Sequence, residues 1–389
     1  MLDVNGLFPV NYEQSRDRFK SEFSMVKRFW PEASLSTHAV HGDESTTIDW
    51  MVAPPTHDYR HLLICTTGQH GIEGYVGSGM LQILLEEFVP QINPHENGLL
   101  LVHAINPWGM KHKRRTNSNN VDLNRNFFWM SPGGSSEASW NRDINPDYVR
   151  LEGFLNPVRP LGKLGWSKFL FGLRFFYTVV SKGPTALRNA SLLGQYRSRQ
   201  GVYFGGDGRQ EEVQVMTDLY QTCIKPYDRI LHLDMHTGFG LQYQMGVVNS
   251  PLEPRESSDL EEAFDYPRVL KANPGETYTI NGDMIDYMYD MVKNKYPKKH
   301  LYATSFEFGT IGLSLAASVK SLRTMVWENQ IYWNGAKNSS DKTQASRDFQ
   351  EMFFPSEDQW RAEAVADARR AFTGILRAEG LIPSGDRQV

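Results

Sequence analysis

A histidine and a glutamate stand three residues apart in a glycine-rich stretch, residues 66–74, as His70 and Glu73. A short apolar segment precedes the stretch at 61–65, and apolar residues with helical spacing follow it at 80–88. The pattern predicts a tight turn between a strand and a helix, a place where α/β proteins bind ligands. An imidazole and a carboxylate this close together can bind one metal ion.

A catalytic zinc ion needs three protein ligands and an open position for water. The segment 229–238 predicts a second strand that ends in a glycine turn, with His236 at its carboxyl end. His232 competes for the role because it lies on the same face of that strand. We expect His236 because it adjoins the turn. Asp234 shares this face, and we expect it either to support the histidine or to be a buried, hydrogen-bonded core residue.

Two further groups of residues are suited to act on a substrate beside a metal. The polar loop 113–127 contains asparagines and three arginines, Arg114, Arg115 and Arg125. A guanidinium group binds a carboxylate through two parallel hydrogen bonds, and one nearer the metal can stabilise an oxyanion. A solvated basic loop is the alternative. Glu307 ends an apolar strand, where a carboxylate is costly unless it is paired or functional, and beside a metal-bound water it would be a general base.

The elements that would position these groups alternate between strands and helices. The chain shows no internal repeat and no linker long enough to divide it. We therefore expect a single α/β domain over residues 1–389, with a mixed, mostly parallel central sheet flanked by helices. The predicted core strands cover 61–65, 99–105, 229–236 and 301–308, and the predicted helices include 12–30, 277–294 and 356–378.

The pattern loosens between about 130 and 215, and we interpret this region as an insertion between core strands. Within it, residues 164–180 are rich in aromatic side chains but carry Lys168 and Arg174, which argues against a membrane span. We expect a packed helix there, and an amphipathic helix that seeks a surface is the alternative. The glycine-flanked segment 201–206 is a candidate for a loop that lines a pocket.

The composition is that of a globular protein with a large core: 389 residues, 22% charged and 40% hydrophobic. The net charge of −4 gives no reason to expect a general attraction to nucleic acid or to an anionic membrane. Two cysteines provide no disulfide framework. The N-terminus lacks the basic and apolar regions of a secretory signal, so we expect a cytoplasmic location.

These motifs resemble those of the zinc carboxypeptidase superfamily, and the aspartoacylase and succinylglutamate desuccinylase branch is similar too. Residues 68–73 resemble its first metal motif, and 121–127 resemble its carboxylate-binding motif. Residues 233–238 resemble the strand that bears its third metal ligand, and 106–109 resemble its Asn-Pro-Asp-Gly turn, with Trp108 in place of the aspartate. The match is closest over residues 60–128.

The resemblance implies a metal site. His70, Glu73 and His236 would bind one Zn²⁺ per chain. Asp122 would accept a hydrogen bond from the other nitrogen of His70 and so hold its tautomer.

The resemblance also implies how a substrate would be bound and attacked. Arg115 would stabilise the oxyanion, with Arg114 as the second choice. Asn124 and Arg125 would hold the substrate carboxylate. Glu307 would be the general base.

The implied activity is hydrolysis of an amide or peptide bond next to a free carboxylate, by metal-activated water, on a peptide or an acyl-amino acid. An N-acyl amino acid deacylase like aspartoacylase is one alternative, and a zinc-bearing binding module without catalysis is another. The superfamily also has a substrate-capping tyrosine before the catalytic glutamate, for which Tyr278 and Tyr287 are candidates.

Overall fold

One eight-stranded sheet forms the centre of the computed structural model, which describes residues 4–128, 145–272 and 280–383. Its strands are β1 (Ser34–Ala39), β2 (Thr47–Ala53), β3 (His61–Thr67), β4 (Asn97–His103), β5 (Arg229–Thr237), β6 (Met245–Asn249), β7 (Val269–Lys271) and β8 (His300–Phe308). Their order is β1-β2-β4-β3-β5-β8-β6-β7. The central strands β4-β3-β5-β8 are parallel, while β1–β2, β2–β4 and β6–β8 pair antiparallel. The predicted α/β class with a mixed sheet is confirmed.

The central strands are apolar along almost their whole length because both of their faces are covered. All seven residues of β3 and all seven of β4 are buried. Near-continuous apolar runs are typical of strands covered by helices on both sides. The bounds predicted for these two strands, and for β5 and β8, closely match the structure.

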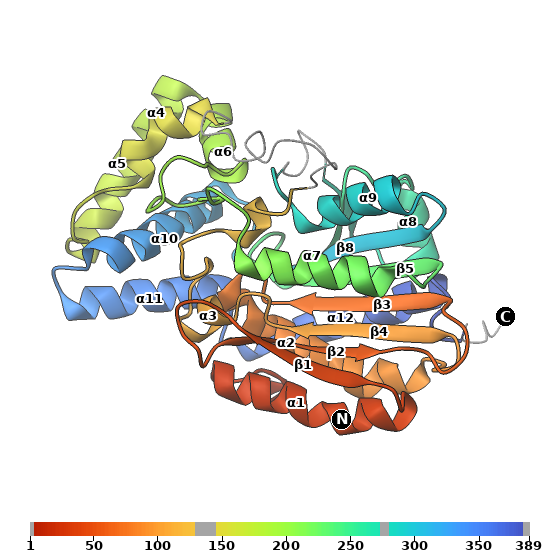
Figure 1. Cartoon of the computed structure of the whole chain (residues 1–389). Coiled ribbons are helices and arrows are strands. Elements are labelled where there is room, and N and C mark those ends of the chain that lie inside the picture. The colour runs from red at the N-terminus through yellow and green to blue at the C-terminus, as the bar shows by residue number, and fades with distance from the viewer. Residues whose placement is uncertain (1–3, 129–144, 273–279, 384–389) are drawn as a thin grey trace.

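Helices cover both faces of the sheet (Figure 1). The helices α1, α2, α8 and α12 pack on one face, and α7 and α9 pack on the other. The described helices are α1 (Tyr12–Phe29), α2 (Gly74–Ile83), α3 (Pro107–Lys111), α4 (Pro146–Leu155), α5 (Leu164–Lys182), α6 (Pro184–Leu192), α7 (Glu211–Ile224), α8 (Ser257–Phe264), α9 (Met284–Lys295), α10 (Leu315–Asn334), α11 (Ser339–Phe353) and α12 (Asp358–Ala378).

The helix predicted over 277–294 begins later than expected. The carboxylate of Asp283 accepts hydrogen bonds from the backbone N–H groups of Ile285 and Asp286, so it caps α9 and sets its start at Met284. Its N-terminus thereby lies next to the loop that contains Asn124, since Asp283 also bonds that side chain.

A second group of helices, α4 to α6 with α10 and α11, projects from one end of the sheet (Figure 1). The packed helix predicted over 164–180 is wrong in part: Phe171 and Thr178 are the buried residues of α5, and most of its other large apolar side chains are exposed. The insertion over about 130–215 stays a prediction. None of the described helices is long and apolar enough to cross a membrane.

The carboxyl ends of β3, β5 and β8 meet at one edge of the sheet because these strands are parallel and adjacent. His70 follows β3, and His236 and Glu307 are the penultimate residues of β5 and β8. The sheet topology therefore brings together three residues that are far apart in the sequence.

Candidate metal centre

The turn after β3 places His70 and Glu73 at the edge of the sheet. Gly68 has a φ of +64°, a left-handed conformation that glycine adopts without strain. Gly71 begins a short 3₁₀ helix, Gly71–Glu73, and packs so tightly on α3 that an added Cβ would lie 2.1 Å from the carbonyl carbon of Gly109. Glycine is therefore needed at both positions for the turn to close.

Three side chains, two from this turn and one from the end of β5, converge on one point. The Nδ1 atom of His70 lies 3.0 Å from one oxygen of Glu73, and the Nδ1 atom of His236 lies 3.0 Å from the other. All three residues are buried, and their candidate ligand atoms lie within 4.8 Å of one another. The structure thus brings together the three residues that the sequence proposes as ligands, and two imidazoles with a carboxylate match the donor set of a catalytic zinc site.

A carboxylate contacts the Nε2 atom of each histidine, on the side of the ring away from Glu73. The Nε2 atom of His70 lies 2.9 Å from Asp122, and the Nε2 atom of His236 lies 2.6 Å from Asp234. With a proton on Nε2 shared with the carboxylate behind it, each neutral histidine would direct the lone pair of Nδ1 at the common point. Asp122 lies where the sequence places it, and of the two alternatives for Asp234 the structure shows contact with His236.

His232 lies outside the cluster formed by His70, Glu73 and His236. Its Nε2 atom is 2.9 Å from the hydroxyl of Thr66, which donates its one hydrogen to Asp234 and so accepts a hydrogen bond from His232. Burial lowers the pKa of His232 to about 4, so it is neutral at pH 7. His232 therefore supports Asp234 through Thr66, and His236 is the histidine that faces Glu73.

The cluster attracts positive charge. Burial alone would raise the pKa of Glu73, but His70, His236 and Arg115 lower it well below its usual range. Burial alone would lower the pKa of His236, but the carboxylates of Asp234 and Glu73 raise it well above its usual value. A divalent cation in place of a shared proton would satisfy both groups.

Glu307 lies beside His236, one of the candidate ligands, on the neighbouring strand. His236 and Glu307 are direct partners in the register of β5 and β8, so their side chains point to the same side of the sheet. Glu307 is buried, with an exposed fraction of 6%. A carboxylate in this place can accept a proton from a molecule bound at the metal ligands.

The two neighbouring arginines point in different directions. Arg115 donates hydrogen bonds to Glu73 at 3.0 Å and to Asp122 at 3.3 Å, so its guanidinium group borders the cluster. Arg114 instead pairs with Glu328 of α10 at 2.7 Å and stacks on the ring of Tyr332. The structure therefore brings Arg115, and not Arg114, to the three candidate ligands.

Asn124 and Arg125 follow Asp122 in a short 3₁₀ turn. The side-chain amide of Asn124 accepts a hydrogen bond from Gln69 at 2.9 Å and donates one to Asp283 at 2.9 Å. Nη1 of Arg125 donates to the backbone oxygen of Asn124, while its buried Nε atom has no hydrogen-bond partner among the described residues. Asn124 is thus held by the protein, and Arg125 keeps a donor for a ligand.

The tyrosines show what sequence reasoning missed. Tyr278 lies outside the described residues, and Tyr287 is buried in the core beside Phe127. Tyr203 interacts electrostatically with Arg115, and burial raises its pKa to about 12, so its hydroxyl keeps its proton at pH 7. Tyr203 also has a φ of +59°, which is rare outside glycine and often marks functional loops. The sequence contains one signal for Tyr203, the glycine-flanked segment 201–206, which was a candidate for a loop that lines a pocket.

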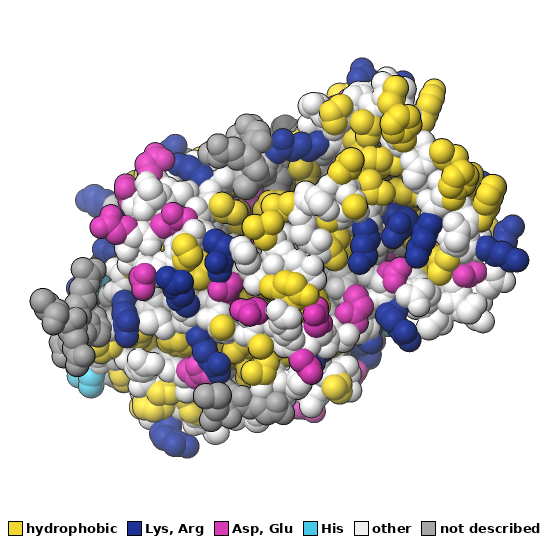
Figure 2. Space-filling model, turned by 180° about the vertical axis from the view of Figure 1, so that it is seen from behind, with side chains coloured by type: hydrophobic (Ala, Val, Ile, Leu, Met, Phe, Trp, Pro, Cys, Tyr) yellow, Lys and Arg dark blue, Asp and Glu magenta, His cyan; other side chains and the backbone are white. Residues whose placement is uncertain are grey.

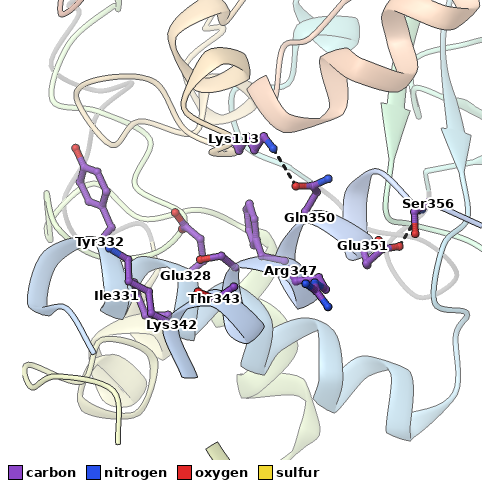
Figure 3. Close-up of a pocket in the computed structure, with 12 residues that line it drawn as sticks. Lys113, Glu328, Ile331, Tyr332, Lys342, Thr343, Arg347, Gln350, Glu351 and Ser356 are labelled. Carbon is purple, nitrogen blue, oxygen red and sulfur yellow. Dashed lines mark hydrogen bonds between the residues drawn. The ribbon is translucent and has the colours of Figure 1, made fainter. Parts of the chain in front are cut away.

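A pocket of about 830 Å³ opens between α10 and α11, and none of the three candidate ligands lines it. Figure 3 shows its lining side chains, among them Glu328 and Tyr332 of α10 and Lys113, which is hydrogen-bonded to Gln350. Helix α11 lines this pocket, and Phe353 at its C-terminal end contacts the guanidinium group of Arg115. The three residues proposed as metal ligands therefore lie outside this open pocket.

Asp234→Asn should weaken zinc binding by about 10- to 100-fold, because a neutral amide orients and polarises His236 less well. Competition with a chromophoric chelator measures the affinity. Asp49→Asn is the matched control, since Asp49 is also buried but pairs with Arg16 at a distance from the cluster, and it should leave zinc affinity unchanged. Equal affinities for the Asp234 variant and the wild type would show that the carboxylate does not support the histidine.

Comparisons with known proteins identify one family over most of the chain. A family model described as "Protein of unknown function (DUF2817)" matches residues 8–367. No curated protein matches the chain.

Several solved structures are similar to the chain. Bovine thrombin-activatable fibrinolysis inhibitor, in complex with tick carboxypeptidase inhibitor, has a TM-score of 0.44 and 14% identity, over 82% of this chain and 97% of that chain. Carboxypeptidase A from Helicoverpa armigera has a TM-score of 0.43 and 13% identity, over 86% and 73% of the two chains. An aspartoacylase family protein from Mesorhizobium loti has a TM-score of 0.36 and 14% identity, over 79% and 68%.

Proposed function

The chain belongs to the DUF2817 family, and we propose that it is a zinc-dependent hydrolase that cleaves an amide bond next to a free carboxylate. One observation carries the proposal: the Nδ1 atoms of His70 and His236 and the carboxylate of Glu73 converge within 4.8 Å, while carboxylates hold both Nε2 atoms. A zinc ion held by these three residues would supply Lewis acidity for the substrate carbonyl and lower the pKa of a bound water to about 7.

Glu307 is the proposed general base. Its carboxylate takes a proton from the attacking water as the new bond from oxygen to the carbonyl carbon forms. It then passes that proton to the leaving nitrogen as the carbon–nitrogen bond breaks, so a carboxylic acid and an amine result. Its position beside His236 in the strand register supports this role.

Arg115 and Tyr203 are the proposed groups that stabilise charge on the substrate oxygen. The guanidinium group of Arg115 lies against Glu73, at the rim of the cluster, where a substrate carbonyl would become an oxyanion. The hydroxyl of Tyr203 keeps its proton at pH 7 and so can donate a hydrogen bond. Arg115 is held by Glu73 and Asp122 before substrate binds, which lowers the cost of reorganisation in the transition state.

Arg125 is the proposed anchor for the substrate carboxylate. Its unpartnered Nε atom supports this role, because a buried donor without a partner costs free energy that a bound carboxylate would recover. Asn124, whose amide already bonds Gln69 and Asp283, is proposed to position the turn that carries Arg125.

Matched pairs of substrates test the proposal. The zinc-loaded chain should hydrolyse acylated dipeptides with a free C-terminal carboxylate and spare the same peptides with a C-terminal amide. Cleavage of N-acyl amino acids alone would point to the deacylase alternative. No hydrolysis across both panels by zinc-loaded protein would favour a binding module.

Arg125→Gln should raise the KM for a carboxylate substrate by about 10- to 100-fold, the effect expected when a hydrogen bond to a charged group is lost. Steady-state kinetics on the free acid measure it. Lys113→Gln is the control, because Lys113 is an exposed cation of the same loop that bonds Gln350 and should leave KM unchanged. Equal KM values for wild type and Arg125→Gln would remove Arg125 from carboxylate binding.

A further inference from the structure

Helix α5 presents a ridge of large apolar side chains to the outside of the protein. Each of the six residues that form the ridge is between 52% and 71% exposed. They recur every three or four positions, so they lie along one side of the helix. We call this surface the α5 ridge: Trp166, Phe169, Leu173, Phe176, Tyr177 and Val180.

The opposite side of α5 is the one that packs against the protein. Phe171 contacts Phe154 of α4 and Trp327 of α10, with ring centroids 5.0 and 6.5 Å apart. The ridge is therefore not part of the core, and replacing its side chains with polar ones should leave the fold intact. Aromatic side chains gathered in this way on a helix surface are typical of an interaction site.

The segment around the ridge carries charge of one sign. Residues 153–206 contain eight basic residues and no acidic residue, although the whole chain has a net charge of −4. All eight basic side chains are exposed, and one of them, Arg199, pairs with Asp207 just beyond the segment. Figure 2 shows hydrophobic side chains gathered on the projecting helices, with lysine and arginine side chains bordering them. The eight are Arg159, Lys163, Lys168, Arg174, Lys182, Arg188, Arg197 and Arg199.

We propose that the α5 ridge docks on the surface of a bilayer that contains anionic phospholipids. An amphipathic helix with aromatic residues on one side and lysine or arginine around it lies in the plane of the interface, with its apolar side among the acyl chains. Trp166 and Tyr177 suit this boundary because each has an apolar ring and a polar group. Lysine and arginine side chains border the projecting helices (Figure 2), and their charge complements that of the phosphate headgroups.

A second copy of this chain fits the ridge less well. Ridge-to-ridge pairing of two copies would bring their basic segments together, and residues 153–206 offer no carboxylate to pair with them. Like charges that face each other oppose association, whereas an anionic lipid surface attracts the same residues.

Vesicle co-sedimentation of the full-length chain tests the proposal. The chain should bind phosphatidylcholine vesicles with about 30% phosphatidylglycerol at least about tenfold more tightly than pure phosphatidylcholine vesicles. Serine at three ridge positions should lower binding at least about tenfold, and serine at three similarly exposed leucines elsewhere should not. The ridge variant is Trp166→Ser, Phe176→Ser and Val180→Ser, and the control is Leu241→Ser, Leu313→Ser and Leu315→Ser.

A second pair of variants isolates the charge. Reversal of three lysines near the ridge should abolish the preference for anionic vesicles, and reversal of three exposed lysines elsewhere should keep it. Thermal unfolding of every variant should match the wild type, since all positions are exposed. The near set is Lys163→Glu, Lys168→Glu and Lys182→Glu, and the distant set is Lys225→Glu, Lys293→Glu and Lys298→Glu.

Three results would overturn the proposal. Two of them, no binding to anionic vesicles or unchanged binding by both the ridge variant and the near set, would show that α5 does not dock on lipid. A concentration-dependent dimer in light scattering, lost in the ridge variant, would assign the ridge to a second copy of the chain instead.

Discussion

Glu307→Gln should lower the turnover number of the zinc-loaded chain by about a hundredfold to ten-thousandfold, the range that a general base contributes, with zinc content unchanged. Glutamine keeps the size of the side chain but cannot accept the proton of the attacking water. Glu307 neighbours His236 in the strand register but is not one of the three converging side chains, so the ligand set stays complete. Stopped assays on the preferred free-acid substrate measure the turnover number, and mass spectrometry on the same sample measures the zinc content.

Glu328→Gln is the control for this experiment. Glu328 pairs with Arg114 and lines the open pocket between α10 and α11. If the buried cluster is the active site, this variant should retain turnover within about twofold, because Glu328 touches neither substrate nor ligands. The reverse pattern, with activity lost in Glu328→Gln and kept in Glu307→Gln, would move the active site to the pocket in Figure 3.

His236→Ala should abolish stoichiometric zinc binding, with a loss of affinity greater than the roughly 100-fold limit seen for residues that only support a ligand. Alanine removes one of three donors and leaves Glu73 and Asp234 without their shared partner. Zinc per chain, measured by mass spectrometry after dialysis, should fall from about one to near zero, and hydrolysis should fall with it.

His232→Ala is the matched control, because it removes a buried histidine from the same face of the same strand. His232 bonds Thr66 and does not face Glu73, so zinc should remain at about one per chain. Zinc retained in His236→Ala and lost in His232→Ala would identify His232 as the ligand. Failure of the wild type to take up zinc would refute the proposed hydrolase and leave the lipid-binding proposal standing, because the α5 ridge does not involve the cluster.

The prediction of the fold succeeded where apolar periodicity is strong. Strands β3 and β4 are buried on both faces, and this burial produces the continuous apolar runs from which they were predicted. The later start of α9 escaped prediction, since it depends on the cap at Asp283. A cap of this kind is a single side chain, and it competes with a helical pattern that extends on both sides of it.

Residues near one another in the sequence were easier to assign to the candidate site than residues brought together by folding. His70 and Glu73 share one turn, and Asp122 belongs to a recognisable motif, so each could be proposed from its neighbours in the chain. The roles of these residues stay predictions. Tyr203 and Gln69 were missed, because their positions near Arg115 and Asn124 depend on loops that pack only in the folded chain.

The sequence by itself determined the α/β class, the central strands and the candidate ligand residues, because local spacing and apolar runs are recorded directly in the order of residues. Only the tertiary structure showed that Arg115 and not Arg114 borders the cluster, that Asp234 contacts His236, and that the α5 ridge is exposed. Each of these three features depends on what a side chain contacts in the folded protein, which its neighbours in the sequence do not specify. Adjacent arginines have the same local chemistry, and an aromatic helix has the same periodicity whether its second side meets protein or solvent.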